Sequence, residues 1–565
     1  MFIKKCSALL VSAVLLSGLS ASALAVEYPD VAPEHWAYSD IQKASDFGLV
    51  QGMEDGTFQP GEKLNRASFV TILQRMFGWA PAAPDAPTFP DVDASHWAYA
   101  AVETAQAHGI LDAMDQFQPQ AYITREEMSV MLVRALGYER LAQDLAAAGK
   151  ADAFPDVTTH PGHIAVAAAI GMTNGIRDDA TGVVNFQPDS FATRDQAAAM
   201  LARVYERYIS KLDWLHGFYA FSSYNQIGYT AQLDGVSVGW ARLAWSPDAG
   251  AWINDQKTDN NDWVKPNDYQ TATSYFQGNN TPYNLNVYAD TNQNVPLADD
   301  SKTSAVAGIL ATPDSRAQAI AVLAQAAGAY SGLTIDFEGM KEDQRANFTA
   351  FMTELRAALP GDKTLYVCVP PDDWYTGFDF RALGEVCDKV IYMVHDYQWT
   401  KTPDYYVGQP IAVDAQSSSP VTPFPRVFEA LRDITDPDTG VQDKSKIALQ
   451  ISFGTAGFQV DENDVLQSTT IYHPAPSTIS GRLAQPDTAV DYDWGYRNPV
   501  ARYAGDDGAT RYLLWYEDAR SVGDKVDLAR MFGITGVSIW RLGNIPDYAD
   551  VPNYDVWSAL QSQRR

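Results

Sequence analysis

Eight short apolar segments constrain the fold of this chain more than any other feature of its sequence. Stretches with helical periodicity separate them, for example 315–329, 342–358 and 522–532. Strands that alternate with helices are typical of a parallel α/β fold. Eight such units over about 350 residues predict a TIM (β/α)8 barrel with insertions. The predicted strands are 216–221, 236–240, 284–289, 332–337, 364–369, 389–394, 447–452 and 536–540.

One segment between the last two predicted strands does not fit this alternation. Residues 455–515 are rich in Asp, Pro and Tyr and lack helical periodicity. We therefore expect a small β-rich insertion after the seventh strand. Strands and insertion together define a barrel domain at 211–565.

The fourth predicted strand carries a pair of acids. Apolar and polar residues alternate through 331–339, so Asp336 and Glu338 project from the same face. Two adjacent carboxylates repel each other, which raises the pKa of one and leaves a proton donor at neutral pH. A proton donor beside an anion suits the cleavage of glycosidic bonds. The plainer alternative is a strand end with two solvated acids.

Other strands of the predicted barrel also end in polar or aromatic residues. A TIM barrel brings the carboxyl ends of its strands together, and its active site lies at that end. His395, Asp396 and Tyr397 close the sixth strand, and Trp540 closes the eighth. We therefore expect these residues to converge on the two acids of the fourth strand.

The first 25 residues have the pattern of a secretory signal peptide. Two lysines precede an apolar run over 8–16, and small residues end the segment. This run is shorter than the roughly 20 residues that a membrane span needs. Cys6 stands before the apolar run, which argues against a lipoprotein, and no later segment is apolar enough to cross a bilayer. The sequence predicts a secreted protein without a membrane span.

The net charge argues against some classes of partner, and the cysteine content limits disulfides and metal sites. The formal net charge is −29, which argues against nucleic acid and anionic membranes as partners. Beyond the signal peptide only Cys368 and Cys387 remain, so one disulfide is compatible with the sequence but not implied. No Cys/His cluster has the spacing of a zinc site. We predict no metal and no cofactor.

The N-terminal part of the chain contains a threefold repeat. Tyr28-Pro-Asp-Val31 recurs as Phe89-Pro-Asp-Val92 and Phe154-Pro-Asp-Val157. A helical pattern, a Gly-rich turn, the tripeptide Phe-Gln-Pro and a second helix follow each copy. The pattern predicts an all-α domain at 26–210, with copies at about 28–85, 86–145 and 150–208.

An arginine directly follows the predicted N-cap of the second helix in each copy. These residues are Arg66, Arg125 and Arg194, after Asn65, Thr124 and Thr193. Asn and Thr are good N-caps, but the helix dipole disfavours a cation in the first turn. An unfavourable cation at the same place in three copies suggests a bound anion.

The triple repeat resembles the S-layer homology domain. The resemblance rests on the three copies, on the three arginines and on the His-Trp pairs that contain Trp36 and Trp97. It implies one helical unit that binds bacterial secondary cell-wall polymer through these side chains, and so a protein of the cell surface. The third copy departs from the pattern, because His163-Ile164 stands where the His-Trp pair would be. Packing in the core is the alternative role for the two tryptophans.

The stretch with the two acids resembles the signature Asp-x-x-Asp-x-Asp-x-Glu of glycoside hydrolase family 18. Asp336 and Glu338 occupy its last two positions, and Ser331 and Thr334 its first two. His395 replaces the Tyr that the family has in Met-x-Tyr-Asp. Further segments are similar to landmarks of the spore-lysing branch of the family, namely 217–221, 240–242, 392–396, 515–518 and 536–543.

The resemblance implies substrate-assisted hydrolysis of β-1,4-linked N-acetylglucosamine in peptidoglycan or chitin. Glu338 would protonate the glycosidic oxygen and later activate water, while the 2-acetamido group of the substrate attacks the anomeric carbon. Asp336 would hold the acetamido N–H. Asp396, with His395 in the tyrosine's place, would steady the same group. Trp540 would lie beneath the apolar face of the sugar.

Four further residues are candidates for substrate binding, namely Tyr397, Trp374, Trp399 and Thr334. The two tryptophans could equally pack in the core or in a lid. Thr334 could donate a hydrogen bond to Asp336. Because a threonine adds no second charge, we expect Asp336 to stay ionised to a more acidic pH than in the two-Asp arrangement of the family.

Three interpretations remain open from the sequence, the plainest being that the wall anchor is the main function and the barrel is only displayed. The leading one is a wall-anchored glycosidase. The alternative is a glycan-binding or structural surface-layer protein on the same barrel, and Ser331, Thr334 and His395 are the reasons to keep it. Glu517 and Asp518 precede the last predicted helix, where helix capping is a simpler role than catalysis.

Overall fold

The computed structural model describes residues 27–220, 223–258, 261–299, 301–371, 375–411 and 420–564. The predicted signal peptide lies outside these residues. The chain divides into two compact units, which we call the repeat unit and the barrel unit. The repeat unit comprises the chain up to Met128 and Asp189–Arg203; the barrel unit comprises Ser129–Pro188 and Val204–Arg565. The division therefore does not fall at the single boundary near residue 210 that the sequence suggests.

The repeat unit is built from helices. They are α1 (Tyr38–Asp46), α2 (Arg66–Phe77), α3 (Tyr99–Ala107) and the first turns of α4 (Arg125–Ala135) and α7 (Arg194–Tyr208). Asn65 caps α2 by accepting a hydrogen bond from the backbone N–H of Ser68, at 2.8 Å. Short bridges Lys63↔Thr193, Asn65↔Tyr122 and Thr124↔Phe191 link the segments that precede the second helices of the three copies.

The repeated aspartate has a structural role in every copy. Asp30 accepts hydrogen bonds from the backbone N–H groups of Phe58 and Gln59, at 2.7 and 2.6 Å. The same pair of bonds joins Asp91 to 117–118 and Asp156 to 186–187. The glutamine has a positive φ of 56° to 58° in each copy, and the two bonds from the aspartate hold that turn. The threefold repetition thus extends to the local structure.

The segment 129–188, which holds the end of the second copy and most of the third, belongs to the barrel unit. It contains α5 (Glu139–Ala147), α6 (Pro161–Ala169) and the hairpin of β1 (Ile176–Arg177) and β2 (Val184–Asn185). The ring of Tyr138 lies 6.1 Å from that of Phe424, and Lys150 forms an ion pair with Glu429. These contacts with the barrel explain why the segment groups with it.

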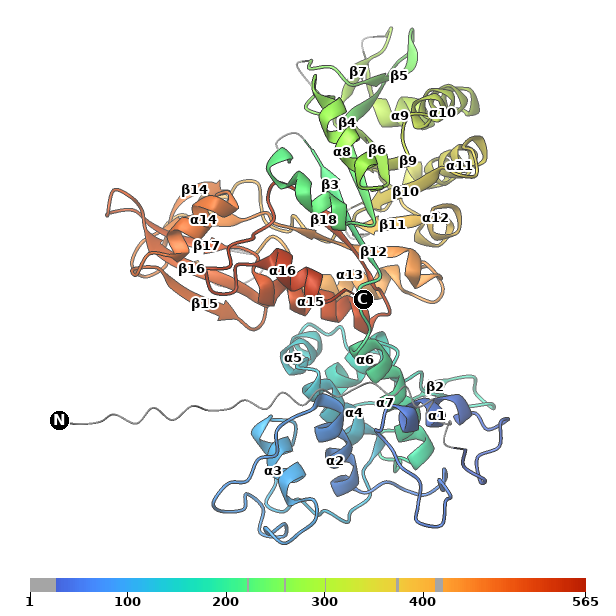
Figure 1. Cartoon of the computed structure of the whole chain (residues 1–565), viewed down its shortest axis with the longest axis vertical. Coiled ribbons are helices and arrows are strands. Elements are labelled where there is room, and N and C mark those ends of the chain that lie inside the picture. Colours follow the sequence, from blue (N-terminus) through green and yellow to red (C-terminus); the bar gives the residue numbers. More distant parts are fainter. Residues whose placement is uncertain are drawn as a thin grey trace, which may run out of the picture. The chain divides into compact units, whose positions relative to one another are not determined.

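Eight parallel strands form the closed barrel that the sequence predicts (Figure 1). The order is β3-β18-β12-β11-β10-β9-β6-β4, and the pairing of β3 with β4 closes it. Each predicted strand overlaps an observed one. The strands are β3 (Trp214–Tyr219), β4 (Gly235–Ser246), β6 (Tyr283–Asp290), β9 (Gly332–Glu338), β10 (Thr364–Val369), β11 (Lys389–Tyr392), β12 (Ile447–Ser452) and β18 (Gly536–Trp540).

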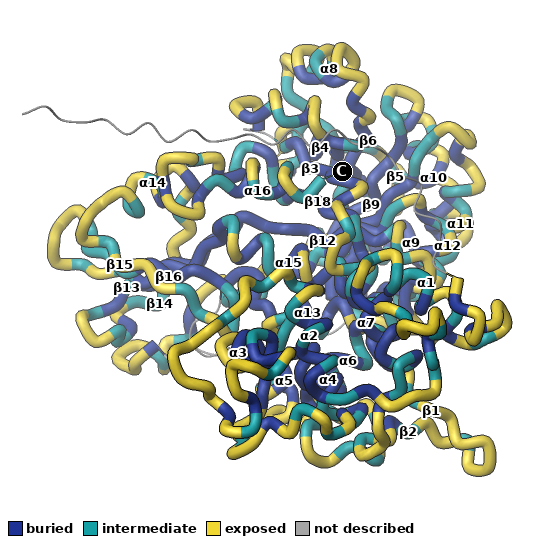
Figure 2. Tube along the Cα trace, turned by 60° about the horizontal axis from the view of Figure 1, so that its bottom comes forward, coloured by how far each residue is buried: buried dark blue, intermediate teal, exposed yellow. Residues whose placement is uncertain are grey.

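Helices and short strands connect the barrel strands, which are buried while most connections are exposed (Figure 2). The α-helices are α8 (Tyr269–Gly278), α9 (Ala305–Leu310), α10 (Pro313–Ala327), α11 (Glu342–Ala358), α12 (Phe380–Val386), α13 (Phe424–Ile434), α15 (Ala519–Met531) and α16 (Val556–Ser562). Three 3-10 helices are η1 (Tyr224–Gln232), η2 (Asp404–Tyr406) and η3 (Lys444–Lys446), and the short strands are β5 (Gly250–Asn254), β7 (Asn294–Pro296) and β8 (Lys302–Ser304).

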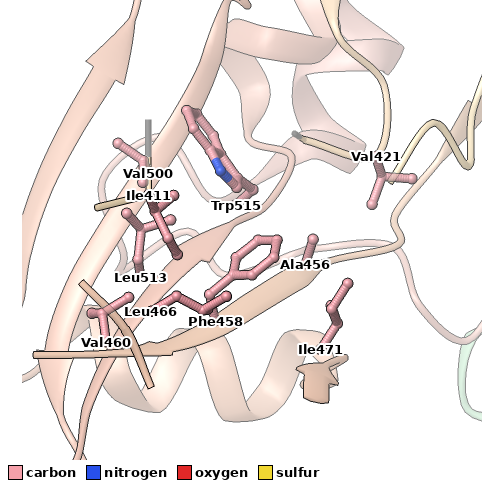
Figure 3. Packing of buried hydrophobic residues seen from close by; sticks show 10 residues of the cluster. All are labelled: Ile411, Val421, Ala456, Phe458, Val460, Leu466, Ile471, Val500, Leu513 and Trp515. Carbon is pink, nitrogen blue, oxygen red and sulfur yellow. The ribbon is translucent and has the colours of Figure 1, made fainter. Parts of the chain in front are cut away.

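The insertion after β12 is an antiparallel sheet of order β14-β13-β17-β16-β15. Its strands are β13 (Ala456–Val460), β14 (Leu466–Tyr472), β15 (Ala489–Asp493), β16 (Asn498–Ala504) and β17 (Arg511–Trp515). The sheet confirms the predicted β-rich insertion, but the segment also contains α14 (Pro476–Leu483), which the sequence analysis did not predict. Its core includes Phe458 and Trp515, and Ile411 and Val421 from outside the sheet join them (Figure 3).

Candidate active site

Strand β9 carries the two acids into the interior of the barrel. Its parallel register with β6 pairs Tyr288 with Asp336 and Asp290 with Glu338. Asp336 is almost fully buried. Glu338 follows it on the same face, two residues nearer to the carboxyl end of β9, and is partly exposed. The structure thus brings both acids to the end of the barrel where the sequence placed the site.

Two neutral side chains, those of Asn286 and Cys368, face the carboxylate of Asp336. The amide of Asn286 donates to Oδ2 at 3.3 Å, and the thiol of Cys368 also donates to this carboxylate. The other oxygen, Oδ1, is buried and has no protein partner. Burial raises the pKa of Asp336 to about 6, although the two donors and the charge of His395 lower it. Burial thus opposes the expected ionisation of Asp336 at acidic pH.

Glu338 has the properties of a proton donor. Burial and the charge of Asp336 raise the pKa of Glu338 to about 8, although the charge of His395 opposes them. At neutral pH this carboxyl group therefore retains its proton, as a general acid requires.

His395 and Asp396 form a hydrogen-bonded pair just beyond the end of β11. Nδ1 of His395 lies 2.8 Å from Oδ2 of Asp396, and Nε2 lies 2.6 Å from Oε1 of Gln450 on β12. Burial would lower the pKa of His395, but the charge of Asp396 and the hydrogen bonds to Asp396 and Gln450 raise it above its usual value. Asp396 has an exposed side chain and a φ of +65°, a region that Asp tolerates better than most residues.

Thr334 lies beneath the acids and does not bond Asp336. Its hydroxyl is fully buried and lies 2.6 Å from the hydroxyl of Ser237 on β4. Ser237 bonds Nε2 of His216, and Nδ1 of His216 bonds Ser538, both at 2.9 Å. The suggested hydrogen bond from Thr334 to Asp336 was wrong, because β4 offers a nearer partner.

An aromatic pocket of 650 Å³ opens beside Trp540. Trp263, from the loop before α8, lies 6.3 Å from Trp540 between ring centroids and stacks on Tyr288 at 4.6 Å. The lining residues are Ala220, Gly239, Lys257, Asp262, Trp263, Val264, Trp540 and Arg541. Aromatic faces of this kind suit the apolar faces of sugars.

The remaining candidates for substrate binding differ in their surroundings. Tyr397 is half-buried, and the guanidinium of Arg426 lies 5.1 Å from its ring. The ring centroid of Trp399 lies 5.3 Å from that of Tyr406, with the two rings tilted by 39°. Trp399 also packs against the core of the inserted sheet. This contact fits the packing alternative for Trp399. Trp374 lies outside the described residues.

Several residues around the acids escaped the sequence analysis. They are Asn286, Cys368, Gln450 and Trp263. Asn286 and Gln450 interrupt predicted strands that are otherwise mostly apolar, and this was a usable signal for polar side chains inside the barrel. Trp263 stands in a loop, where no periodicity indicates its direction.

The three arginines of the repeat contact protein groups. Arg194 donates to the backbone carbonyls of Phe58 and Gln51, at 2.8 and 2.9 Å. Arg66 is buried and lies 3.4 Å from Glu127. Arg125 is buried as well. Contacts between copies thus offset the charge or donor groups of Arg194 and Arg66, and a bound anion at the three arginines stays a prediction.

The two tryptophans of the repeat unit are open to solvent. Trp36 is 59% exposed and Trp97 is 61% exposed, so core packing does not explain them. The indole N–H of Trp36 donates to Asp195 at 3.1 Å. Trp97 lines a pocket of 150 Å³, together with Arg75 and Arg194.

Three further observations concern the whole described chain. In that part, no group of three or more His, Cys, Asp or Glu side chains is arranged to hold a metal ion. None of its helices is long and apolar enough to span a membrane. Cys368 and Cys387 are buried free thiols.

Comparison with known families assigns the two kinds of domain. Residues 298–544 match the model of glycosyl hydrolases family 18, and residues 27–70 and 88–129 match the S-layer homology domain. The chain therefore carries a family 18 glycosidase domain together with S-layer homology domains. The second model matches two of the three predicted copies.

Individual relatives are distant. The cortical fragment-lytic enzyme of Bacillus cereus is 24% identical over 217 residues, which cover 37% of this chain and 45% of the relative. The surface-layer 125 kDa protein of Lysinibacillus sphaericus is 28% identical over 177 residues, which cover 30% and 14%. A solved chitinase from Chromobacterium violaceum ATCC 12472 is 22% identical with a TM-score of 0.46, covering 62% and 98%. The chain thus spans less than half the length of these two curated relatives.

Proposed function

We propose that this protein is a cell-wall-anchored glycoside hydrolase that cleaves β-1,4-linked N-acetylglucosamine in peptidoglycan or a chitin-like glycan. The observation that carries the proposal is the pair of carboxyl groups that β9 holds at the carboxyl end of the barrel, where burial and the charge of Asp336 raise the pKa of Glu338. The S-layer homology domains support attachment to secondary cell-wall polymer at the bacterial surface.

The reaction requires a donor at the leaving oxygen. Glu338 gives its proton to the glycosidic oxygen as the bond from that oxygen to the anomeric carbon breaks. The carbonyl oxygen of the substrate's 2-acetamido group bonds to the same carbon and forms an oxazolinium ion. Water then attacks the anomeric carbon and gives a proton to the carboxylate of Glu338, while the bond from that carbon to the acetamido oxygen breaks and the 2-acetamido group is restored. Both steps invert the carbon, so the configuration is retained.

Asp336 supports the positive intermediate. Its ionised carboxylate lies beside the site of charge, and Oδ1 has no partner in the protein. That oxygen is therefore the acceptor we assign to the acetamido N–H. Trp540 and Trp263 supply aromatic faces for sugar rings near this point.

Glu338→Gln tests the assignment of the acid. Gln is nearly isosteric but cannot donate the proton, so we expect release of reducing sugar to fall by about 10²–10⁴-fold. The measurement uses purified peptidoglycan, chitin oligomers and N-glycans as substrates. The matched control is Glu342→Gln, because Glu342 is exposed in the first turn of α11. A residual rate within tenfold of the parent would show that another residue is the acid.

The pH profile of the parent tests the same pair of groups. Protonation of Asp336 below about pH 6 and deprotonation of Glu338 above about pH 8 both remove the active form, so activity describes a bell. Both limbs belong to the coupled pair. Absence of turnover on every acetamido glycan, with the fold intact, would favour the glycan-binding or structural alternative.

A further inference from the structure

Two buried histidines lie inside the barrel, and their partners differ in kind. His216 has a serine hydroxyl at each ring nitrogen, Ser538 at Nδ1 and Ser237 at Nε2. A hydroxyl can donate or accept, so the two serines satisfy a neutral ring. Burial lowers the pKa of His216 to about 3. His216 is therefore neutral at any pH near 7.

His395 has an oxygen acceptor at each ring nitrogen. Oδ2 of Asp396 faces Nδ1 at 2.8 Å, and Oε1 of Gln450 faces Nε2 at 2.6 Å. Neither oxygen can donate, and a neutral imidazole has only one N–H. With the amide of Gln450 in this orientation, both contacts become hydrogen bonds only when both nitrogens carry a proton, which makes the ring an imidazolium. A reversed amide would donate to Nε2 of a neutral ring, and the resonance experiment below distinguishes the two.

The charged groups around His395 favour the same state. Asp396 lies within hydrogen-bond distance of it, and the ionised carboxylate of Asp336 on β9 interacts with it electrostatically. Glu338 adds a negative charge here only once it has lost its proton. His473 acts on Asp396 from the end of the inserted sheet's β14. Gln450 is neutral. Acids thus outnumber the other titratable groups here.

We propose that His395 is an imidazolium held between Asp396 and Gln450, that it supplies a fixed positive charge beside the two acids of β9, and that Gln450 is the positioning residue for this charge. The role rests on the proposed glycosidase function. Because both N–H groups are engaged, His395 has none to give the substrate, unlike the role that the family resemblance implies for the residue at this place. Its effect is instead to lower the pKa of Asp336, which keeps that carboxylate ionised for the oxazolinium ion.

Nuclear magnetic resonance of the full chain tests the charge directly. With 15N-labelled histidine, the chemical shifts of the two ring nitrogens report which of them is protonated. The His395→Asn variant identifies the signal of His395 by its loss. We expect two protonated nitrogens in His395 at neutral pH and one in His216. A singly protonated His395 at neutral pH would overturn the proposal.

Variants of Gln450 test its role as the positioning residue. Gln450→Leu removes the acceptor at Nε2, so the titration midpoint of His395 should fall by about 1–2 pH units. Gln450→Glu keeps an acceptor and adds a charge, so the midpoint should rise. Ser538→Ala is the matched control, because it removes one partner of His216 and leaves His395 untouched. An unmoved midpoint in both Gln450 variants would overturn the role of Gln450.

The activity profile separates this inference from the proposed function. If the parent hydrolyses a glycan, Gln450→Leu should move the acid limb of the profile upward, because a weaker positive charge raises the pKa of Asp336. A limb that stays in place while the midpoint of His395 moves would contradict the link to Asp336. If the parent has no turnover, the proposed function fails, yet the resonance experiment still decides the charge of His395. If Gln450→Leu does not fold, Gln450→Glu replaces it in the test. Circular dichroism then checks that this variant is folded, and nuclear magnetic resonance measures the titration midpoint of its His395.

Discussion

Thr334 occupies the position where the family signature has an aspartate, and its surroundings explain how a hydroxyl fits there. The side chain is fully buried and bonds Ser237, which continues through His216 to Ser538. The three hydroxyl groups are uncharged, and burial keeps His216 neutral by lowering its pKa. This hydrogen-bonded series therefore adds no second charge below Asp336. The structure therefore leaves Asp336 as the innermost acid of β9.

Substitutions of Thr334 test separately its buried hydrogen bond and the absence of a second negative charge near Asp336. Thr334→Val keeps the volume and removes the hydroxyl, so unfolding should become easier by about 0.5–1.5 kcal/mol while the acid limb of the activity profile stays in place. Thr334→Asp adds a negative charge near Asp336 and should move that limb to higher pH. Denaturant unfolding and pH–rate profiles measure the two effects. Thr334→Ser, which keeps the hydroxyl, is the control, and a limb shifted by the Val variant would contradict the geometry.

The limits of sequence reasoning are visible at single residues. Alternation along one strand was enough to place Asp336 and Glu338 on one face, because that pattern is local. The partners of Arg194 were not predictable in this way, since Gln51 and Phe58 lie far away in the sequence. The helix dipole predicts that a cation in the first turn is unfavourable, but it does not predict which groups offset that cost. Backbone carbonyls of another copy do so here.

At the scale of elements, the sequence predicted the strands of the barrel well and the additions to it poorly. Continuous apolar runs mark strands that are buried on both faces, and such runs have clear ends. The hairpin of β4 and β5 was missed because β4 continues beyond Arg242 to Ser246, where the chain becomes more exposed. Helix α14 was missed because its eight residues are too few for a clear period.

Helix α15 begins at a buried ionic network that ties it to the inserted sheet. Asp518 caps the helix by accepting from the backbone of Ser521, which confirms the capping interpretation. Glu517 is buried and accepts from Lys525 at 2.8 and 3.0 Å, and Lys525 also donates to Asn498 of β16 at 3.1 Å. The network thus joins a barrel helix to the insertion.

Removal of one charge from this network should be severe. Lys525→Met leaves the buried carboxylate of Glu517 without its counter-charge, so we expect a loss of about 3–5 kcal/mol in the free energy of unfolding. The double variant Lys525→Met with Glu517→Gln should recover part of that loss, because no buried charge remains. Lys211→Met, at an exposed lysine, is the matched control and should stay within about 0.5 kcal/mol. A double variant less stable than Lys525→Met would contradict this account.

At the scale of the molecule, the sequence predicted the kinds of domain but not the division of the chain. Repeats and strand patterns show what each segment resembles, whereas compact units depend on which segments pack together. Residues 129–188 carry the end of the second copy and most of the third and yet group with the barrel, whereas Asp189–Arg203 of the third copy group with the repeat unit. Arg207 lies in the last predicted helix of the repeats and donates to the backbone carbonyl of Met531 in α15 at 2.7 Å. This hydrogen bond is one of the contacts that group the chain after residue 204 with the barrel. Removing the chain after residue 210 would therefore break the barrel unit, so wall binding is best tested in the full chain.

Attachment to the wall should depend on the two exposed tryptophans of the repeat unit. Large aromatic side chains that are about 60% exposed are suited to sugar rings, and Trp97 shares its pocket with Arg75 and Arg194. The double variant Trp36→Ala with Trp97→Ala should bind purified cell wall at least about tenfold more weakly in a pelleting assay. If the pocket that Arg75 and Arg194 line holds an anionic polymer, added salt should weaken binding by the parent.

Trp494→Ala is the matched control for this assay. Trp494 lies in the barrel unit between β15 and β16 and is 73% exposed, so its loss removes a comparable aromatic surface. We expect its pelleting to equal that of the parent. Equal weakening in the control would mean that wall binding reflects exposed aromatic rings in general. Undiminished pelleting of the double variant would instead remove Trp36 and Trp97 from the wall-binding surface and leave the two arginines of the pocket to be tested by Arg75→Ala.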